Sequence, residues 1–278
     1  MLQRWLVAIV GLPALLAVLL LCPPWATMAL VCAIAGAAAY ELLRVAGQGE
    51  DRIVGPVVLL AVMQISWLYL ETATGKPLFG SLSAVSAFRY ALVALLFFRA
   101  VATFGKPNAV SFQTVAVAVV AGAVFPMMFS CILLLRMHET YGRLYVLAPF
   151  CIAFAGDSLA MYFGRWFGKR KLTPVSPKKT WAGFYGNILG SVLGMALFGA
   201  VGAHWLGYAP NWLSLALLGV AGNLLGQLGD LSTSLIKREN GVKDYSHLLL
   251  THGGVLDRFD STLFIAPVVY FFVSAGMI

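Results

Sequence analysis

Nine stretches of about 20 mostly apolar residues follow one another along this sequence, each long enough to cross a membrane as a helix. They cover residues 4–22, 25–45, 53–71, 85–104, 110–135, 144–163, 182–206, 212–236 and 259–277. Membrane-spanning β-strands would be shorter and would alternate apolar with polar residues. The sequence therefore predicts an all-α polytopic integral membrane protein with about nine transmembrane helices.

The composition excludes the water-soluble classes. Of the 278 residues, 60% are hydrophobic and only 11% are charged, whereas a soluble domain carries roughly 25% charged residues. A soluble globule of this size needs a larger polar surface. Because no repeat or linker divides the chain, we expect one polytopic domain over 1–278. Within it, residues 1–143 form a helical scaffold, and residues 144–278 carry the catalytic helices and cytoplasmic loops.

The charge distribution predicts the orientation. With a cytoplasmic N-terminus, fifteen of the 19 lysines and arginines lie on the inner side, as the positive-inside rule requires. The basic loops 164–181 and 237–258 then both face the cytoplasm. A net charge of +8 held in short loops favours anionic lipids or phosphorylated substrates as partners, and no nucleic acid. We expect a bacterial inner-membrane protein with its active site facing the cytoplasm.

Glycines on the seventh apolar stretch favour close helix packing. Gly186, Gly190 and Gly194 are spaced four residues apart, so they form one ladder of small residues along the helix. We interpret this ladder as packing within one chain, and a homodimer seam remains the alternative.

The eighth apolar stretch carries one polar face. Its members are Asn223, Gln227, Asp230, Ser234 and Lys237, which share a side of a helix by their spacing. A hydrogen-bond seam between helices would explain Asn223 and Gln227, but it explains an aspartate poorly. A carboxylate in the middle of a membrane costs about 2.5–3.5 kcal/mol on insertion scales. The pattern therefore predicts a cavity beside this helix.

Carboxylates also gather at the start of the last apolar stretch. Asp257 and Asp260 are three residues apart, so they share a face of the predicted helix. Helix capping explains one of them, but hardly both beside two glycines and Arg258. Oxygen ligands with few nitrogen or sulfur partners suit Mg²⁺ better than Zn²⁺. We therefore expect Asp230, Asp257 and, as a helper, Asp260 to bind Mg²⁺, and a second cation is left open.

Basic residues and glycines nearby are suited to an anionic substrate. Lys237, Arg238, Lys243 and Arg258 can bind phosphate oxygens. Gly253 and Gly254 permit a backbone conformation whose N–H groups lie open to an anion. Upstream, the segment from Ser176 to Thr180 joins Lys178 and Lys179 with two hydroxyl side chains after a helix-breaking proline, which predicts a second anion site.

These motifs resemble those of the phosphatidate cytidylyltransferase (CDP-diacylglycerol synthase) family, and they span residues 156–261. The matching signature residues are Ser234, Lys237, Arg238, Lys243, Asp244, His252, Gly253, Gly254, Asp257, Arg258 and Asp260. Further matches are Gly156-Asp157-Ser158, Ser176 to Trp181 and Gly229-Asp230-Leu231. The sequence departs from the family at Ala182, Thr233 and Leu250-Thr251, where the family usually has Glu, an acidic residue and Pro-Gly.

The resemblance implies a membrane-embedded enzyme of phospholipid biosynthesis that transfers CMP from CTP to phosphatidic acid, giving CDP-diacylglycerol and pyrophosphate. It implies catalytic roles for Asp230, Asp257, Ser234 and Lys237. The implied substrate-binding residues are Ser176, Lys178, Lys179, Arg238, Lys243, His252, Gly253, Gly254 and Arg258. Two alternatives stay open: a paralogue that uses another lipid phosphate, and an ion-coupled transporter with Asp157 and Asp230 as intramembrane ion sites.

Overall fold

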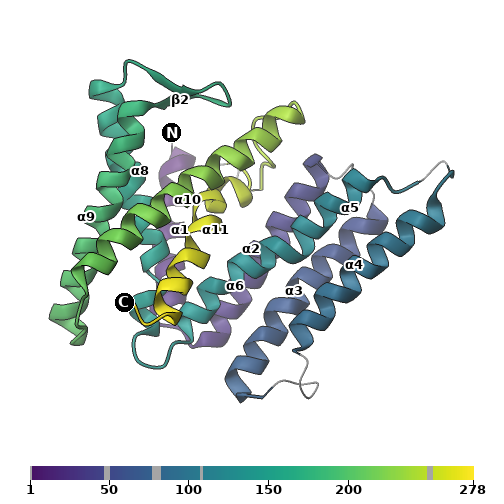
Figure 1. Cartoon of the computed structure of the whole chain (residues 1–278), viewed down its shortest axis with the longest axis horizontal. Coiled ribbons are helices and arrows are strands. Elements are labelled where there is room, and N and C mark those ends of the chain that lie inside the picture. The colour runs from purple at the N-terminus through teal and green to yellow at the C-terminus, as the bar shows by residue number, and fades with distance from the viewer. Residues whose placement is uncertain (1, 47–50, 77–82, 107–108, 249–252) are drawn as a thin grey trace. The chain divides into compact units, whose positions relative to one another are not determined.

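The computed structural model describes residues 2–46, 51–76, 83–106, 109–248 and 253–278 (Figure 1). The chain divides into two compact units. The first contains Met1–Leu133 together with Glu239–Arg258, and the second contains Leu134–Arg238 together with Phe259–Ile278. The segment 239–258 therefore groups with the N-terminal helices. The predicted division into a scaffold over 1–143 and a catalytic part over 144–278 stays a prediction.

Every predicted membrane span forms a helix. Seven spans are long and apolar enough to cross a membrane within the described residues, which makes the chain a polytopic membrane protein. They are Pro24–Ala46, Ile53–Thr74, Ala84–Thr103, Phe112–Arg136, Gly142–Phe167, Trp181–Leu206 and Trp212–Glu239. The first and last predicted spans are the helices α1 (Leu2–Leu20) and α11 (Leu256–Ser274).

The first unit is built from α1 and the helices that follow it. These are α2 (Pro24–Ala46), α3 (Asp51–Thr74), α4 (Ala84–Thr103), α5 (Phe112–Val119), the π-helix η1 (Val120–Val124) and α6 (Phe125–Arg136), whose end belongs to the second unit. Leu42, Ile65 and Phe129 are among its fully buried side chains. Within η1, the carbonyl of Gly122 accepts a hydrogen bond from the Gln64 amide of α3. That bond satisfies a polar side chain buried among apolar helices.

The second unit contains the remaining elements. They are α7 (Gly142–Tyr145), α8 (Ala148–Phe167), β1 (Lys171–Thr173), β2 (Ser176–Thr180), α9 (Trp181–Leu206), α10 (Trp212–Glu239) and most of α11. Its core joins all four long helices, with Ile152, Met195, Leu218 and Val269 each at 0% exposure. Figure 1 shows α8 and α9 running side by side, with the short hairpin at one end of the pair.

The glycine ladder of α9 packs against α8. A Cβ at Gly186 would lie 2.6 Å from Phe163 Cβ, and one at Gly194 would lie 2.6 Å from Ala155 Cβ. At Gly190 the obstacle is the backbone carbonyl of Ala155. Only glycine allows the two helices to approach this closely, so the ladder serves packing within the chain. A homodimer, which the ladder left as an alternative, stays a prediction.

A small antiparallel sheet interrupts the helices and was not predicted. β1 and β2 pair with Lys171 opposite Thr180 and Thr173 opposite Ser176, with an irregularity between the two pairs. The Thr180 side chain ends the hairpin by accepting a hydrogen bond from Gly183 N at 3.1 Å, which caps α9. The segment that contains Lys178 and Lys179 is therefore a fixed strand entering a helix.

Candidate active site

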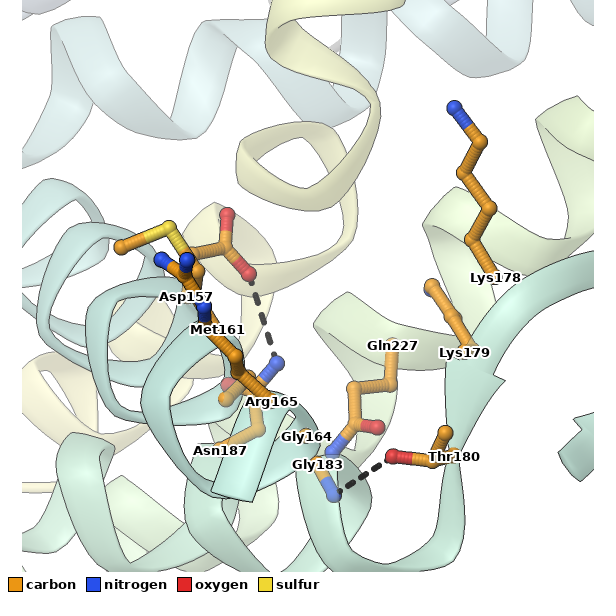
Figure 2. Close-up of a pocket in the computed structure, with 11 residues that line it drawn as sticks. Asp157, Met161, Gly164, Arg165, Lys178, Lys179, Thr180, Gly183, Asn187 and Gln227 are labelled. Carbon is orange, nitrogen blue, oxygen red and sulfur yellow. Dashed lines mark hydrogen bonds between the residues drawn. The ribbon is translucent and has the colours of Figure 1, made fainter. Parts of the chain in front are cut away.

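A cavity of about 460 Å³ lies within the second unit, at the hairpin end of α8 and α9 (Figure 2). Four elements contribute to it: α8, β2, α9 and α10. Its lining residues are Asp157, Ala160, Met161, Gly164, Arg165, Lys178, Lys179, Thr180, Gly183, Asn187 and Gln227. Three of these side chains are cationic, so the cavity is suited to an anionic ligand.

A carboxylate from α10 meets the strand β2 beside this cavity. Asp230 forms an ion pair with Lys179, and about a third or less of either side chain is exposed. Ser234, one turn further along α10, donates to Asp230 Oδ1 at 3.4 Å. Asp230 thus lies between a cation and a hydroxyl group.

A second carboxylate reaches the same space from α8. Asp157 Oδ1 accepts a hydrogen bond from the Asn187 amide of α9 at 3.3 Å, as Figure 2 shows. An adjoining recess is lined by polar groups from several helices and from β2, namely Asp157, Lys179, Asn187, Asn223, Gln227, Asp230 and Ser261. Asp157 and Asp230 are therefore two carboxylates that line this recess, and Asp260 lies close enough to interact electrostatically with Asp230.

Asn223 and Gln227 form a hydrogen-bond seam behind the cavity. The Asn223 amide donates to Ser191 Oγ at 2.6 Å and also to Asn187, while Gln227 Nε2 donates to Asn223 Oδ1 at 2.6 Å. Ser191 in turn donates to the carbonyl of Ile152 at 2.9 Å. The polar face of α10 therefore combines a hydrogen-bond seam at Asn223 and Gln227, where Gln227 also lines the cavity, with Asp230, which lines the adjoining recess.

The oxygen donors of this recess fit Mg²⁺. They are two carboxylates, side-chain amides and the Ser261 hydroxyl, which are hard ligands of the kind that Mg²⁺ prefers. Across the part of the chain that the structure describes, no three His, Cys, Asp or Glu side chains form a cluster able to hold an ion. Mg²⁺ commonly binds through one or two carboxylates and completes its shell with water and substrate phosphates. The donor set therefore suits an ion shared with a phosphorylated substrate.

The predicted metal ligands Asp257 and Asp260 have other partners in this structure. Asp257, in the first unit, accepts from Tyr245 N at 2.8 Å and from Gly254 N at 2.9 Å. Asp260, in the second unit, accepts from Ser261 N at 2.7 Å and from Thr233 Oγ1 at 3.4 Å. Thr233 is one of the departures from the family pattern, and its hydroxyl lies within hydrogen-bond distance both of this carboxylate and of the Asp230 carbonyl, at 3.1 Å. Metal binding by Asp257 and Asp260 stays a prediction.

Gly253 adopts a backbone conformation that favours glycine, but the N–H group of Gly254 is not open to an anion, as we had expected it to be. Gly253 has φ +81°, which favours glycine, and the Gly254 N–H points to Asp257.

The other predicted substrate residues are placed as follows. Lys178 and Lys179 line the cavity, Ser176 is half-buried in β2 outside the lining, Lys237 is buried on α10, and Arg238, Lys243 and Arg258 are exposed. His252 and Leu250-Thr251 lie outside the described residues.

Several site residues were missed from the sequence. The sequence indicated Asp157 only as part of a motif and as an ion site for a transporter, although it lines both the cavity and the adjoining recess. Its motif Gly156-Asp157-Ser158 inside an apolar helix was the signal that could have identified it. Asn187 carries no such signal, because a single asparagine among glycines and apolar residues is equally consistent with packing. Arg165 was counted only as a loop charge.

The chain is similar in sequence to known cytidylyltransferases. The cytidylyltransferase family matches the chain over residues 2–275. The phosphatidate cytidylyltransferase of Bacillus subtilis is 32% identical over 246 residues, which cover 88% of this chain and 87% of that protein. The phosphatidate cytidylyltransferase of Staphylococcus epidermidis is 46% identical over 48% of its own length and 46% of this chain. A protein of the same name from Synechocystis is 42% identical over 44% of its length and 48% of this chain.

Proposed function

Because this chain belongs to the cytidylyltransferase family, we propose that it is a phosphatidate cytidylyltransferase, which makes CDP-diacylglycerol for phospholipid biosynthesis. The observation that carries this proposal is the identity of 32% with the Bacillus subtilis enzyme along 88% of the chain. The cationic cavity beside Asp157 and Asp230 supports it, since both substrates are phosphate anions. The comparisons favour this enzyme over an ion-coupled transporter.

The reaction is a displacement at phosphorus. An oxygen of the phosphatidic acid phosphate attacks the α-phosphorus of CTP and forms the new P–O bond. The bond from that phosphorus to the bridging oxygen breaks, and pyrophosphate leaves with the electron pair. Because the attacking phosphate is already an anion, it needs no strong general base. The main obstacle is repulsion between two anions, which fixed positive charges reduce.

The residues of the cavity are suited to that task. Lys178 and Lys179 hold one of the two anionic substrates, and Arg165 of α8 adds a third cation to the cavity lining. Ser234 and Lys237 line the same face of α10 as Asp230. By the motif resemblance, Arg238, Lys243, His252 and Arg258 orient the triphosphate or pyrophosphate.

The metal assignment follows from the donor set. Asp230 and Asp157 would hold Mg²⁺ in the recess. The motif resemblance separately implies that Asp257 and Asp260 are metal ligands. When bound, Mg²⁺ would neutralise charge on the phosphates and on the leaving pyrophosphate. A cytoplasmic site at the inner membrane of a bacterium agrees with the basic loops and with the bacterial relatives.

The test is product analysis on the purified protein in liposomes that contain phosphatidic acid, with labelled CTP and Mg²⁺. We expect CDP-diacylglycerol and pyrophosphate in equal amounts. Asp230→Asn should lower turnover by about 100-fold or more, because it weakens the metal site, whereas Ser232→Ala on the same helix should not. Near-normal turnover of a folded Asp230→Asn protein would reject the metal role. Turnover of another lipid phosphate in place of phosphatidic acid would identify the chain as a paralogue.

A further inference from the structure

Glu41 is a buried carboxylate that takes no part in the mechanism proposed above. It lies in the last turns of α2, within the first unit, and is only 2% exposed. A buried carboxylate needs hydrogen-bond donors to compensate for its lost hydration. Every partner found for Glu41 in the described residues comes from the segment 246–256, more than 200 residues further along the chain.

Those partners are the backbone N–H groups of Val255 and Leu256 and the side-chain hydroxyl of Ser246. Glu41 Oε1 accepts from Val255 N at 2.9 Å and from Ser246 Oγ at 2.6 Å. Its Oε2 accepts from Leu256 N at 2.7 Å. Val255 and Leu256 stand at the beginning of α11, where helical N–H groups have no partner within the helix. Glu41 therefore caps α11 from a different helix.

The position of the Glu41 carboxylate explains why residue 254 is a glycine. A Cβ at Gly254 would lie 2.6 Å from both Glu41 oxygens, a distance that real Cβ atoms do not show. Only glycine at position 254 lets the carboxylate approach the helix start. Gly254 is therefore matched to Glu41.

Asp257 completes the arrangement from inside the segment. Its Oδ2 accepts from Tyr245 N and Gly254 N, so two carboxylates together satisfy four backbone N–H groups. The cap at Val255 and Leu256 fixes the first turn of α11, which carries Asp257. Loss of the Glu41 contacts would free the backbone immediately before Asp257.

We propose that Glu41 is a positioning residue for the cytidylyl transfer: from α2 it holds Ser246 and the start of α11, so that Asp257 and Arg258 are presented in the geometry the reaction needs. This inference rests on the proposed function. Groups that orient metal-binding residues typically change metal affinity or activity by about 10- to 100-fold when they are replaced.

The test compares Glu41→Gln with a matched control, Glu71→Gln. Glu71 accepts from Ala84 N at 2.6 Å and from Ser83 Oγ at 2.7 Å, so it also holds the start of a helix, α4, away from the signature. In Glu41→Gln we expect the Mg²⁺ concentration for half-maximal rate to rise by about 10-fold or more. We expect Glu71→Gln to keep the wild-type Mg²⁺ requirement. A merely destabilised protein would lose kcat in proportion to its folded fraction while its Mg²⁺ requirement stayed unchanged.

Hydrogen exchange provides a readout that needs no activity. In Glu41→Gln the amides of Val255 and Leu256 should exchange faster, and in Glu71→Gln they should keep the wild-type rate. If Glu41→Gln does not fold, Ser246→Ala removes one donor to the same carboxylate and should produce both changes at smaller size. Wild-type exchange and a wild-type Mg²⁺ requirement in the folded variant would overturn the proposal. Absence of CDP-diacylglycerol from the wild-type protein would instead reject the proposed function, while the exchange data would still test the contact.

Discussion

Gly156 lies on α8 at a point where the polar seam leaves no room for a methyl group. A Cβ there would lie 2.6 Å from Ser191 Oγ and 2.9 Å from Asn223 Nδ2, and it would also collide with Asn187 Oδ1. Gly156→Ala should therefore separate α8 from α9 and α10. Overpacking costs about 1–3 kcal/mol, and two lost hydrogen bonds of Asn223 add about 0.5–1.5 kcal/mol each. The better helix propensity of alanine returns about 1 kcal/mol.

The net expectation is a free energy of unfolding lower by about 1–5 kcal/mol. Thermal unfolding in detergent, followed by circular dichroism, measures this change. The matched control is Gly55→Ala in α3, where a Cβ meets nothing within 4 Å. That variant should unfold at or above the wild-type temperature. If Gly156→Ala were as stable as the wild type, the seam would not be the reason for a glycine at this position.

Two further predictions concern Lys179 and Thr180, which lie at the end of the strand β2. Lys179→Met removes the cation paired with Asp230, and we expect kcat/KM for cytidylyl transfer to fall by about 10-fold or more, since hydrogen bonds to charged groups contribute about 1.5–3 kcal/mol. Lys171→Met, in β1 outside the cavity lining, should keep the wild-type value, and equal effects of both substitutions would contradict a local role. Thr180→Ala removes the cap of α9 and should lower the free energy of unfolding by about 1 kcal/mol in denaturant titrations. Thr180→Ser keeps the hydroxyl and should retain most of that stability.

The membrane helices could be predicted because their signal is local. A run of apolar residues long enough to span a bilayer has few other stable conformations, since every backbone polar group must be satisfied within the segment. The hairpin could not be predicted in the same way. Its strands β1 and β2 are three and five residues long, mostly polar, and contain a proline. Such short strands carry no periodicity, and their pairing depends on the helices that precede and follow them.

The polar face of α10 was predictable, but the different contacts made by the residues along it were not. Spacing places Asn223, Gln227 and Asp230 on one side of a helix, whatever that side meets. The partners that distinguish them come from elsewhere: Asn187 and Ser191 from α9 for the seam, and Lys179 from β2 for Asp230. The sequence of α9 shows its glycines more clearly than its two hydrogen-bonding residues. The distinction therefore required the packing of α8, α9 and α10.

Glu41 shows why a buried carboxylate has to be interpreted through its partners. In the sequence it is one acidic residue near the end of an apolar helix, which is equally consistent with a side chain that reaches the membrane surface. Among the described residues of the structure, its oxygens accept from the backbone N–H groups of Val255 and Leu256 and from the Ser246 hydroxyl. Asp230 contrasts with it, because its partner Lys179 is a side chain that also lines the cavity. A flexible lysine can exchange a carboxylate for a substrate phosphate, whereas a helix start cannot move without unwinding. Glu41 is therefore suited to shape the site, and Asp230 is suited to take part in it.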